Sequence, residues 1–292
     1  MKKKKKKKGR ITNVILIIVF LAGLSLLLYP TVSNYWNSFH STRAIAGYAQ
    51  VVADLNTEEY DRLWTDAVNY NRSLLDRQNS YVLTPEQEAQ YNDLLNLGGN
   101  GIMGYIEIPC IGVNLPIYHG TSDSVLQIAV GHLSWTSLPV GGAGTHCVLS
   151  GHRGLPSAKL FTNLDKVRVG DTFLLRVLDE VLTYEVDQIR TVEPQVTEDL
   201  LIAEGKDYCT LVTCTPYGIN SHRLLVRGHR IENAAEAVTV RVTADAIQIE
   251  PLLIAPIVAV PLLLILLLLL LTRDGAKKRK KKITLEDLRE ET

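Results

Sequence analysis

One cysteine in the sequence occupies a position suited to a nucleophile. Cys214 ends the apolar stretch TLVTC, and the Thr215-Pro216 pair that follows would interrupt a strand. A cysteine at the exposed end of a strand is open to a substrate, whereas Cys209 lies inside the apolar run, as a buried structural cysteine would. Because the thiolate is the reactive form, a nucleophile at Cys214 needs positive charge nearby.

Two other residues could supply that charge. His152 lies in the Gly-flanked turn SGHRG after the alternating stretch CVLS, and such turns commonly present catalytic groups. It could form an ion pair with Cys214 and protonate a leaving amine. Arg223 comes nine residues after Cys214, past a turn. If neighbouring strands carry these two residues, the guanidinium returns to the level of the thiol and could donate to a substrate carbonyl or a developing oxyanion.

Each member of this trio also has an ordinary explanation. A cysteine at a strand end can be structural, a lone histidine in a turn can belong to the solvated surface, and an arginine at a strand edge is usually a solvated charge. Two other classes of protein are therefore considered. A papain-like or NlpC/P60-like peptidase is disfavoured, because its cysteine commonly opens a helix and precedes the histidine. A membrane-anchored binding module would not need Cys214, His152 and Arg223 together.

The stretches around the trio resemble those of a known family. TLVTC at 210–214 with Arg223 nine residues on is similar to the sortase signature, and SGHRG at 150–154 is similar to the sortase histidine segment. Further stretches resemble the pilin-polymerising class C sortases of Gram-positive bacteria: MGYIEIP (103–109), NLPIYHGT (114–121), SLPVGG (137–142), GLPSAKLF (154–161) and HRLLVRGHRI (222–231). The resemblance is close over about 100–232.

The resemblance implies a fold and a reaction. The fold is mainly β, a sortase-type eight-stranded β-barrel with an N-terminal helical extension and two flanking transmembrane helices. Cys214 would attack the Thr–Gly bond of an LPxTG-type sorting signal and form a thioacyl enzyme, which a pilin lysine or a cell-wall amine would resolve. His152 would be the acid/base and Arg223 would stabilise the substrate. Thr213 would help to bind the substrate or the oxyanion through its side chain. No cofactor and no metal are implied.

One segment departs from the family pattern. Class C sortases usually carry a lid over the cysteine, held by an Asp-Pro-aromatic anchor shortly before the barrel. The corresponding stretch, 74–99, contains no Asp-Pro-Trp or Asp-Pro-Phe. Tyr81 or Asp76 could substitute for the anchor. The stretch is therefore either a looser cover for the site or a spacer.

Strands must position the trio. Turn signals at close spacing divide the part of the chain after residue 101 into short apolar runs, which predict a barrel or sandwich. The expected strands are 104–108, 114–117, 145–150, 172–178, 181–192, 208–213 and 223–229, with a hairpin turn at Asp179-Glu180. Since the resemblance implies eight strands, this list of seven has merged or missed one.

The part before the barrel has a helical pattern. Apolar residues recur at helix spacing from Ile45 to Leu55, and Asn56 with Glu59 predicts a capping box that opens a second helix. Thr84-Pro85-Glu86 is typical of the start of a third helix. The glycines around Asn100 then end this region as a flexible joint.

Two long uncharged runs predict membrane spans. Residues 11–29 and 251–271 are 19 and 21 residues long and carry no charge, enough for a helix to cross the hydrocarbon core. Basic blocks flank the outer end of each run, so the positive-inside rule places both termini in the cytoplasm and 30–250 outside. A cleaved signal peptide is the alternative for the first run, but no A-x-A site follows it. A cleaved sorting tail is the alternative for the second, but no LPxTG-like pentapeptide precedes it.

Seven segments follow from these patterns. They are a cytoplasmic basic tail (1–10), a transmembrane helix (11–29), an extracellular helical or lid region (30–100), a catalytic β-barrel (101–232), a tether (233–250), a second transmembrane helix (251–271) and a cytoplasmic basic tail (272–292). The segment 30–250 holds 15 basic and 26 acidic residues, a net charge of −11. This disfavours nucleic acid as a partner, since nucleic acid needs a basic face. The expected partners are the plasma membrane and the pilins.

Four cysteines are too few for a disulfide scaffold. Cys209 and Cys214 are five apart in one expected strand and should point to opposite faces, so they cannot easily bond. The states of Cys110, Cys147 and Cys209 stay open at this point. The sequence contains no C-x2-C motif and no H-x3-H motif with matching partners, so it does not predict a zinc site.

Overall fold

The computed structural model describes residues 3–75, 82–234 and 263, and the side chains from residue 15 onward. The chain divides into two compact units, one made of 1–31 with 245–292 and the other of 32–244. The expected second span at 251–271 and the basic tail at 272–292 lie outside the described residues, apart from residue 263. Almost all of the tether at 233–250 lies outside them too.

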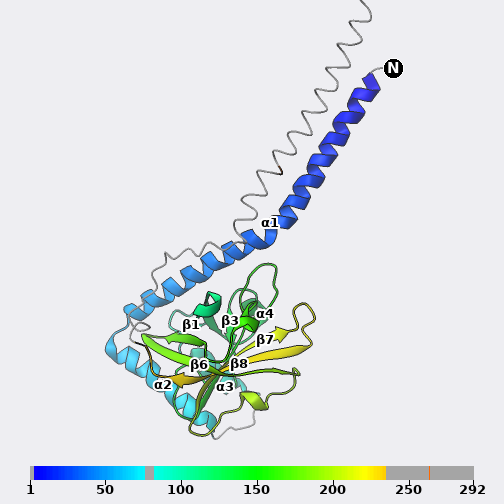
Figure 1. Cartoon of the computed structure of the whole chain (residues 1–292). Helices are drawn as coiled ribbons and strands as arrows, with labels where there is room; N and C mark the ends of the chain where they lie inside the picture. The colour runs from blue at the N-terminus through cyan, green and yellow to red at the C-terminus, as the bar shows by residue number, and fades with distance from the viewer. Residues whose placement is uncertain (1–2, 76–81, 235–262, 264–292) are drawn as a thin grey trace, which may run out of the picture. The chain divides into compact units, whose positions relative to one another are not determined.

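Eight strands close into a barrel in the second unit (Figure 1). The strands are β1 (Ile102–Ile108), β2 (Val113–His119), β3 (Val130–His132), β4 (Thr145–Ser150), β5 (Thr172–Val177), β6 (Glu180–Val192), β7 (Asp207–Thr215) and β8 (His222–Ile231). Their order around the barrel is β1-β2-β3-β4-β7-β8-β6-β5. The pairs β2–β3 and β4–β7 are parallel, and the other pairs are antiparallel. The expected eight-stranded barrel is confirmed.

The strand that the sequence did not predict is β3. It has three residues, all buried, so it offers neither an alternating pattern nor an apolar run of useful length. The short helix α4 (Asp123–Leu126) precedes it. The other seven strands fall where they were expected, with ends that differ by a few residues. The expected turn at Asp179-Glu180 shifts by one position, because β6 already begins at Glu180 and Leu178 takes the left-handed conformation, with φ 52°.

Alternation along the strands gives the barrel an inner and an outer face. On β7, Cys209 and Leu211 belong to the large core inside the barrel, whereas Val212 belongs to a small separate cluster with Val148, Leu200 and Leu225. Cys214 has the same parity as Val212 and so projects outward. The candidate nucleophile therefore lies at the end of the outer face, and Cys209 lies on the inner one, as expected.

Three helices precede the barrel. They are α1 (Lys3–Ala53), α2 (Thr57–Leu75) and α3 (Pro85–Asp93). The expected boundaries at residues 10 and 29 are not visible in the secondary structure, because α1 runs through both and through Pro30. Of the helices in the described ranges, α1 is the one long and apolar enough to cross a membrane, by its length and composition from Ile15 onward.

Buried polar contacts attach these helices to the barrel. On α1, the Tyr48 hydroxyl accepts from the backbone N–H of Leu178 (2.7 Å) and donates to the carbonyl of Met103 (3.1 Å). On α2, the Asn71 amide forms two hydrogen bonds with the backbone of Leu138 (2.7 and 3.0 Å). Because buried polar groups are costly when unpaired, these contacts fix the helices in register with the barrel.

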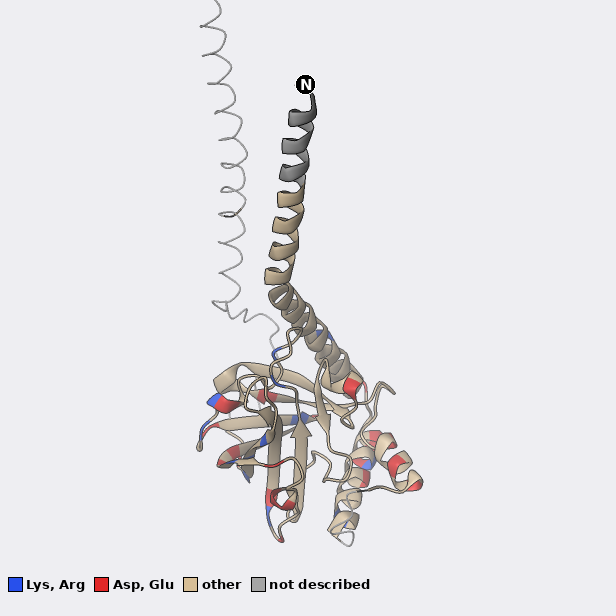
Figure 2. Ribbon diagram, turned by 90° about the vertical axis from the view of Figure 1, so that its right-hand side faces the viewer, with Lys and Arg blue, Asp and Glu red and all other residues tan. Residues whose placement is uncertain are grey.

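The starts of α2 and α3 are capped as the sequence predicts. Asn56 accepts from the N–H of Glu59 (2.9 Å), and Thr84 forms a full capping box with Gln87 behind Pro85. Acidic side chains outnumber basic ones on these two helices (Figure 2). This distribution agrees with the negative charge of 30–250.

Candidate active site

The β7–β8 ladder brings two members of the predicted trio together. Cys214 on β7 and Arg223 on β8 are direct Cα partners in this antiparallel pair. Both side chains are partly buried. The Arg223 Nη1 donates to the carbonyls of Asn220 (3.3 Å) and His222 (3.2 Å). The guanidinium thus lies against the backbone of the β7–β8 turn.

The β4–β7 ladder brings the third member to the same level. The two strands run parallel, with Ser150 opposite Val212, and the N–H of Gly151 continues the ladder by donating to the Val212 carbonyl (3.0 Å). His152 lies two residues after Ser150, and Cys214 lies two residues after Val212. Cys214 and Arg223 therefore lie at the ends of β7 and β8, and His152 lies in the turn that follows β4, at the same end of three neighbouring strands.

Thr213 forms a hydrogen bond with the turn that carries His152. It is buried, and its hydroxyl donates to the Gly151 carbonyl at 2.7 Å. That bond ties the strand before Cys214 to the turn before His152. The hydroxyl oxygen keeps its lone pairs as acceptors, so the expected contact of Thr213 with the substrate or oxyanion stays a prediction.

The turn that carries His152 is tightly packed. A Cβ on Gly151 would come within 2.6 Å of the Phe161 ring, and one on Gly154 would meet the Tyr217 ring at 2.9 Å. Gly154 also has a φ of +79°, which side chains rarely adopt. The glycines of SGHRG therefore allow the turn to lie against two aromatic rings, and this packing limits where His152 can move.

Arg153 is a residue of this region that sequence reasoning missed. Its side chain is 9% exposed, its Nη2 lies 2.6 Å from Asp165 Oδ2, and its Nη1 donates to the Thr215 hydroxyl at 3.2 Å. It also lies 6.0 Å from the centre of the Tyr217 ring. Arg153 thus braces the histidine turn against the segment after Cys214. A charged residue inside a Gly-flanked motif was the signal that could have revealed it.

Known proteins are similar to this chain over the barrel. Residues 106–231 match the family model described as the sortase domain. Sortase C1 from Streptococcus agalactiae, a solved structure, is 50% identical; the match covers 66% of this chain and 100% of that one, with a TM-score of 0.65. The chain belongs to the sortase family. This sortase is accordingly a cysteine transpeptidase.

Two further solved structures are similar to this sortase. Streptococcus pneumoniae sortase C is 47% identical, over 66% of this chain and 98% of that one, with a TM-score of 0.60. A Clostridium perfringens sortase C, solved with the C-terminal cell wall sorting motif, is 44% identical, over 66% of this chain and all of that one, with a TM-score of 0.59.

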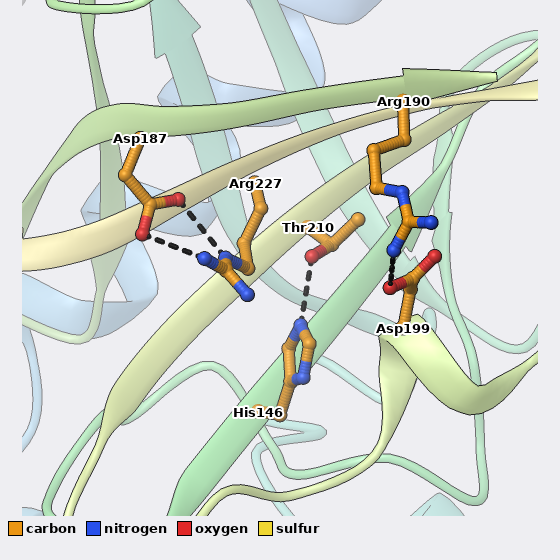
Figure 3. A network of polar contacts seen from close by, with 6 residues as sticks. All are labelled: His146, Asp187, Arg190, Asp199, Thr210 and Arg227. Carbon is orange, nitrogen blue, oxygen red and sulfur yellow. Dashed lines mark hydrogen bonds and ion pairs between the residues drawn. The ribbon is translucent and has the colours of Figure 1, made fainter.

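Farther from the trio along β4, β7 and β8, the outer face of this sortase carries a polar network (Figure 3). His146 on β4 lies between the Leu201 carbonyl (Nδ1, 2.8 Å) and the Thr210 hydroxyl (Nε2, 2.7 Å). Because a carbonyl only accepts, Nδ1 must carry the proton, and Nε2 of the neutral ring accepts from Thr210. Burial favours that neutral form and lowers the pKa of His146 to about 4.

The network holds the segment between β6 and β7 against the sheet. Arg190 on β6 pairs with Asp199 at 2.5 Å, next to the His146 contact with the following turn. Beside these contacts, Arg227 on β8 forms two hydrogen bonds of 2.9 Å with Asp187 on β6. Its guanidinium lies over the Tyr208 ring, 4.2 Å from the ring centre. The 193–206 segment is thereby fixed beside the outer face that ends at Cys214.

Two predictions about the surroundings of the site remain open. Asp76 and Tyr81, the suggested lid anchors, lie outside the described residues. In the part of the chain that the structure describes, no group of three His, Cys, Asp or Glu residues is arranged to hold a metal ion.

Proposed function

We propose that this sortase is a pilin-polymerising enzyme of class C, with Cys214 as nucleophile, His152 as acid/base and Arg223 as substrate-stabilising residue. The observation that carries the proposal is the pairing of Cys214 with Arg223 across β7 and β8, with His152 brought level by β4. Support for the class comes from the 44–50% identity with solved sortases C, one of which was studied for pilin substrate specificity.

The proposed first half-reaction cleaves the sorting signal. The Cys214 thiolate attacks the carbonyl carbon of threonine in an LPxTG-type signal, and the oxyanion forms within reach of the Arg223 guanidinium. His152, as imidazolium, also favours the thiolate. When the C–N bond to glycine breaks, His152 gives its proton to the leaving amine, and a thioester to Cys214 remains.

The proposed second half-reaction joins two proteins. A neutral lysine amine of another pilin attacks the thioester carbonyl, His152 takes the proton that the amine loses, and the Cys214 thiolate leaves. The product is an isopeptide bond, and the enzyme returns to its starting state. A cell-wall amine is the alternative acceptor, which would attach the protein to the wall instead.

A transfer assay tests this function. Full-length protein in detergent is incubated with a labelled LPxTG-type peptide and a lysine-containing pilin peptide, and the ligated product is measured by mass spectrometry. We expect product with the wild-type enzyme and with the Cys110→Ala control, and none with Cys214→Ala. Neither cleavage nor ligation across a range of LPxTG-like peptides would refute the proposal. Ligation to a cell-wall peptide but never to a pilin lysine would refute the pilin class alone.

The membrane topology is part of the same proposal. Both termini lie in the cytoplasm, and the barrel lies outside the plasma membrane, where sorting signals arrive. Support comes from the apolar helix α1 and from the basic blocks beside both uncharged runs.

A further inference from the structure

Two cysteines of the barrel core have no part in the proposed reaction. Cys147 lies on β4 and Cys209 on β7, and their side chains are 2% and 0% exposed. They are direct Cα partners in the parallel β4–β7 ladder. Both are free thiols in the structure. Their position in the core raises the question of what the pair does in an exported protein.

The pair meets the geometric conditions for a disulfide. Paired residues on neighbouring strands project to the same side, and both cysteines belong to the core inside the barrel. Neighbouring strands lie about 4.8 Å apart, inside the Cα–Cα window of roughly 4.4–6.8 Å for disulfides. Cys214 projects to the opposite face, and Cys110 is exposed in the turn Pro109–Ile111. Cys147 and Cys209 are therefore the pair that can bond without a change of strand register.

The two thiols also influence each other chemically. Burial opposes ionisation of Cys147, but hydrogen bonds from Cys209 and His132 outweigh it and lower the pKa of Cys147. Burial and the hydrogen bond to Cys147 raise the pKa of Cys209. In the folded barrel, Cys147 is therefore the member of the pair that ionises more readily. Thiol–disulfide exchange requires a thiolate to attack first and a second thiol to resolve the intermediate.

We propose that Cys147 and Cys209 form an intramolecular disulfide when the protein is exported. One of the two cysteines, as its thiolate, attacks the disulfide of an extracytoplasmic thiol–disulfide oxidant, releasing one of its sulfurs as a thiol. The other cysteine, after losing its proton, attacks the cysteine sulfur of the mixed disulfide and releases the second. Two protons and two electrons pass to the oxidant, which becomes a dithiol. Because the folded core buries both cysteines, exchange precedes closure of the barrel.

The position of this bond relates it to the active site. Cys147 lies five residues before His152, and Cys209 lies five residues before Cys214. The crosslink therefore joins the two strands at equal distances from the candidate acid/base and the candidate nucleophile. A covalent bond at this level prevents β4 from slipping along β7. It therefore preserves the strand register that places His152 beside Cys214.

Peptide mapping tests the proposal directly. Full-length protein is unfolded, refolded into detergent in a buffer containing oxidised and reduced glutathione, and treated with iodoacetamide in denaturant without reductant. We expect a crosslinked peptide pair containing Cys147 and Cys209, lighter by two hydrogen atoms than the sum of the two peptides, with Cys110 and Cys214 alkylated. Four alkylated cysteines, or a crosslink that includes Cys110 or Cys214, would overturn it.

Thermal unfolding gives a second readout. With the disulfide in place, a phosphine reductant should lower the unfolding midpoint of the wild-type protein by roughly 10 °C, because the bond closes a long loop. The Cys110→Ser variant should keep this drop, and the Cys209→Ala variant should lose it. An equal drop in the Cys209→Ala variant would contradict the assignment. Both readouts are independent of transfer activity, so the proposed function can fail without affecting them.

Discussion

At the scale of single residues, the Arg223 guanidinium donates through Nη1 to two backbone carbonyls, and Arg223 is the direct Cα partner of Cys214 in the β7–β8 ladder. We predict that Arg223→Ala lowers kcat for peptide transfer by roughly 10²–10³-fold, as the loss of an oxyanion donor does elsewhere. Arg223→Lys should recover a small part of this, since an ammonium lacks the planar fork. The thermal midpoint should change little because the side chain is only partly buried. Full activity of Arg223→Ala would refute the role.

Arg153 carries a prediction of a different kind. Its contacts with Asp165 and Thr215 brace the histidine turn against the strand end, so its loss should misplace His152 relative to Cys214. We expect Arg153→Met to lower kcat by roughly tenfold to a hundredfold while KM for the sorting peptide changes less. The measurement is steady-state transfer kinetics.

The matched control for Arg153 is Asp165→Asn. An asparagine oxygen can still accept from the Arg153 Nη2, and the contact of Arg153 with Thr215 is unchanged, so this variant should retain most of the activity. If Arg153→Met raised KM and left kcat unchanged, Arg153 would act on the substrate and not through the turn.

At the scale of elements, the segment between β6 and β7 depends on a neutral His146. Burial lowers its pKa from an ordinary 6.5 to about 4. Between pH 4 and pH 6.5, His146 is mostly protonated in the unfolded chain and mostly neutral in the folded one. His146 therefore costs no stability above pH 6.5, and the folded state becomes less stable as pH falls from 6.5 towards 4. The loss should reach about 3 kcal/mol near pH 4.

Thermal midpoints at pH 7.5, 5.5 and 4.5 test this dependence on His146. The pKa of His119 is also lowered, by burial first, so part of the acid sensitivity belongs to that residue. The relevant quantity is the difference between the wild-type protein and His146→Gln. We expect the midpoint of the variant to fall less steeply between pH 6.5 and 4.5. Parallel curves would show that His146 does not titrate in this range.

The elements differ in how far the sequence predicts them. Strands such as β7 and β8 have clear apolar runs and turn signals, and so the approach of Arg223 to Cys214 follows once they are neighbours. The parallel β4–β7 pairing was not predictable from local pattern, because about 60 residues separate the two strands and no turn links them. The three residues of β3 are too few to show a period.

The position of Thr213 was predictable in principle. Strand alternation places it on the same face as Cys209 and Leu211, whose apolar neighbours mark that face as the core. The substrate contact that the family resemblance suggested stays a prediction, and the structure shows the hydroxyl donating to the Gly151 carbonyl. Arg153 was missed for another reason: its partner Asp165 lies twelve residues away in a 3-10 turn of three residues, which is too short to show a spacing pattern.

At the scale of the whole molecule, the proposed topology has a consequence for Cys110. This cysteine is exposed on the barrel, while Cys147 and Cys209 are buried in it. If the barrel lies outside the plasma membrane, a membrane-impermeant maleimide should label Cys110 in intact cells. The test uses the Cys214→Ala background, so that the candidate nucleophile does not react. Burial raises the pKa of Cys110, so labelling is best measured at mildly alkaline pH, where more thiolate is present.

The expected result is full labelling in intact cells and no further increase when the cells are opened. A Cys110→Ser control in the same background should give no label in either sample, since the remaining thiols are in the core. Label that appears only after the cells are opened would place the barrel in the cytoplasm. The enzyme could not then meet exported sorting signals, and the oxidised Cys147–Cys209 pair would lose its oxidising surroundings. Orientation in the membrane thus decides at once whether the reaction and the disulfide are possible.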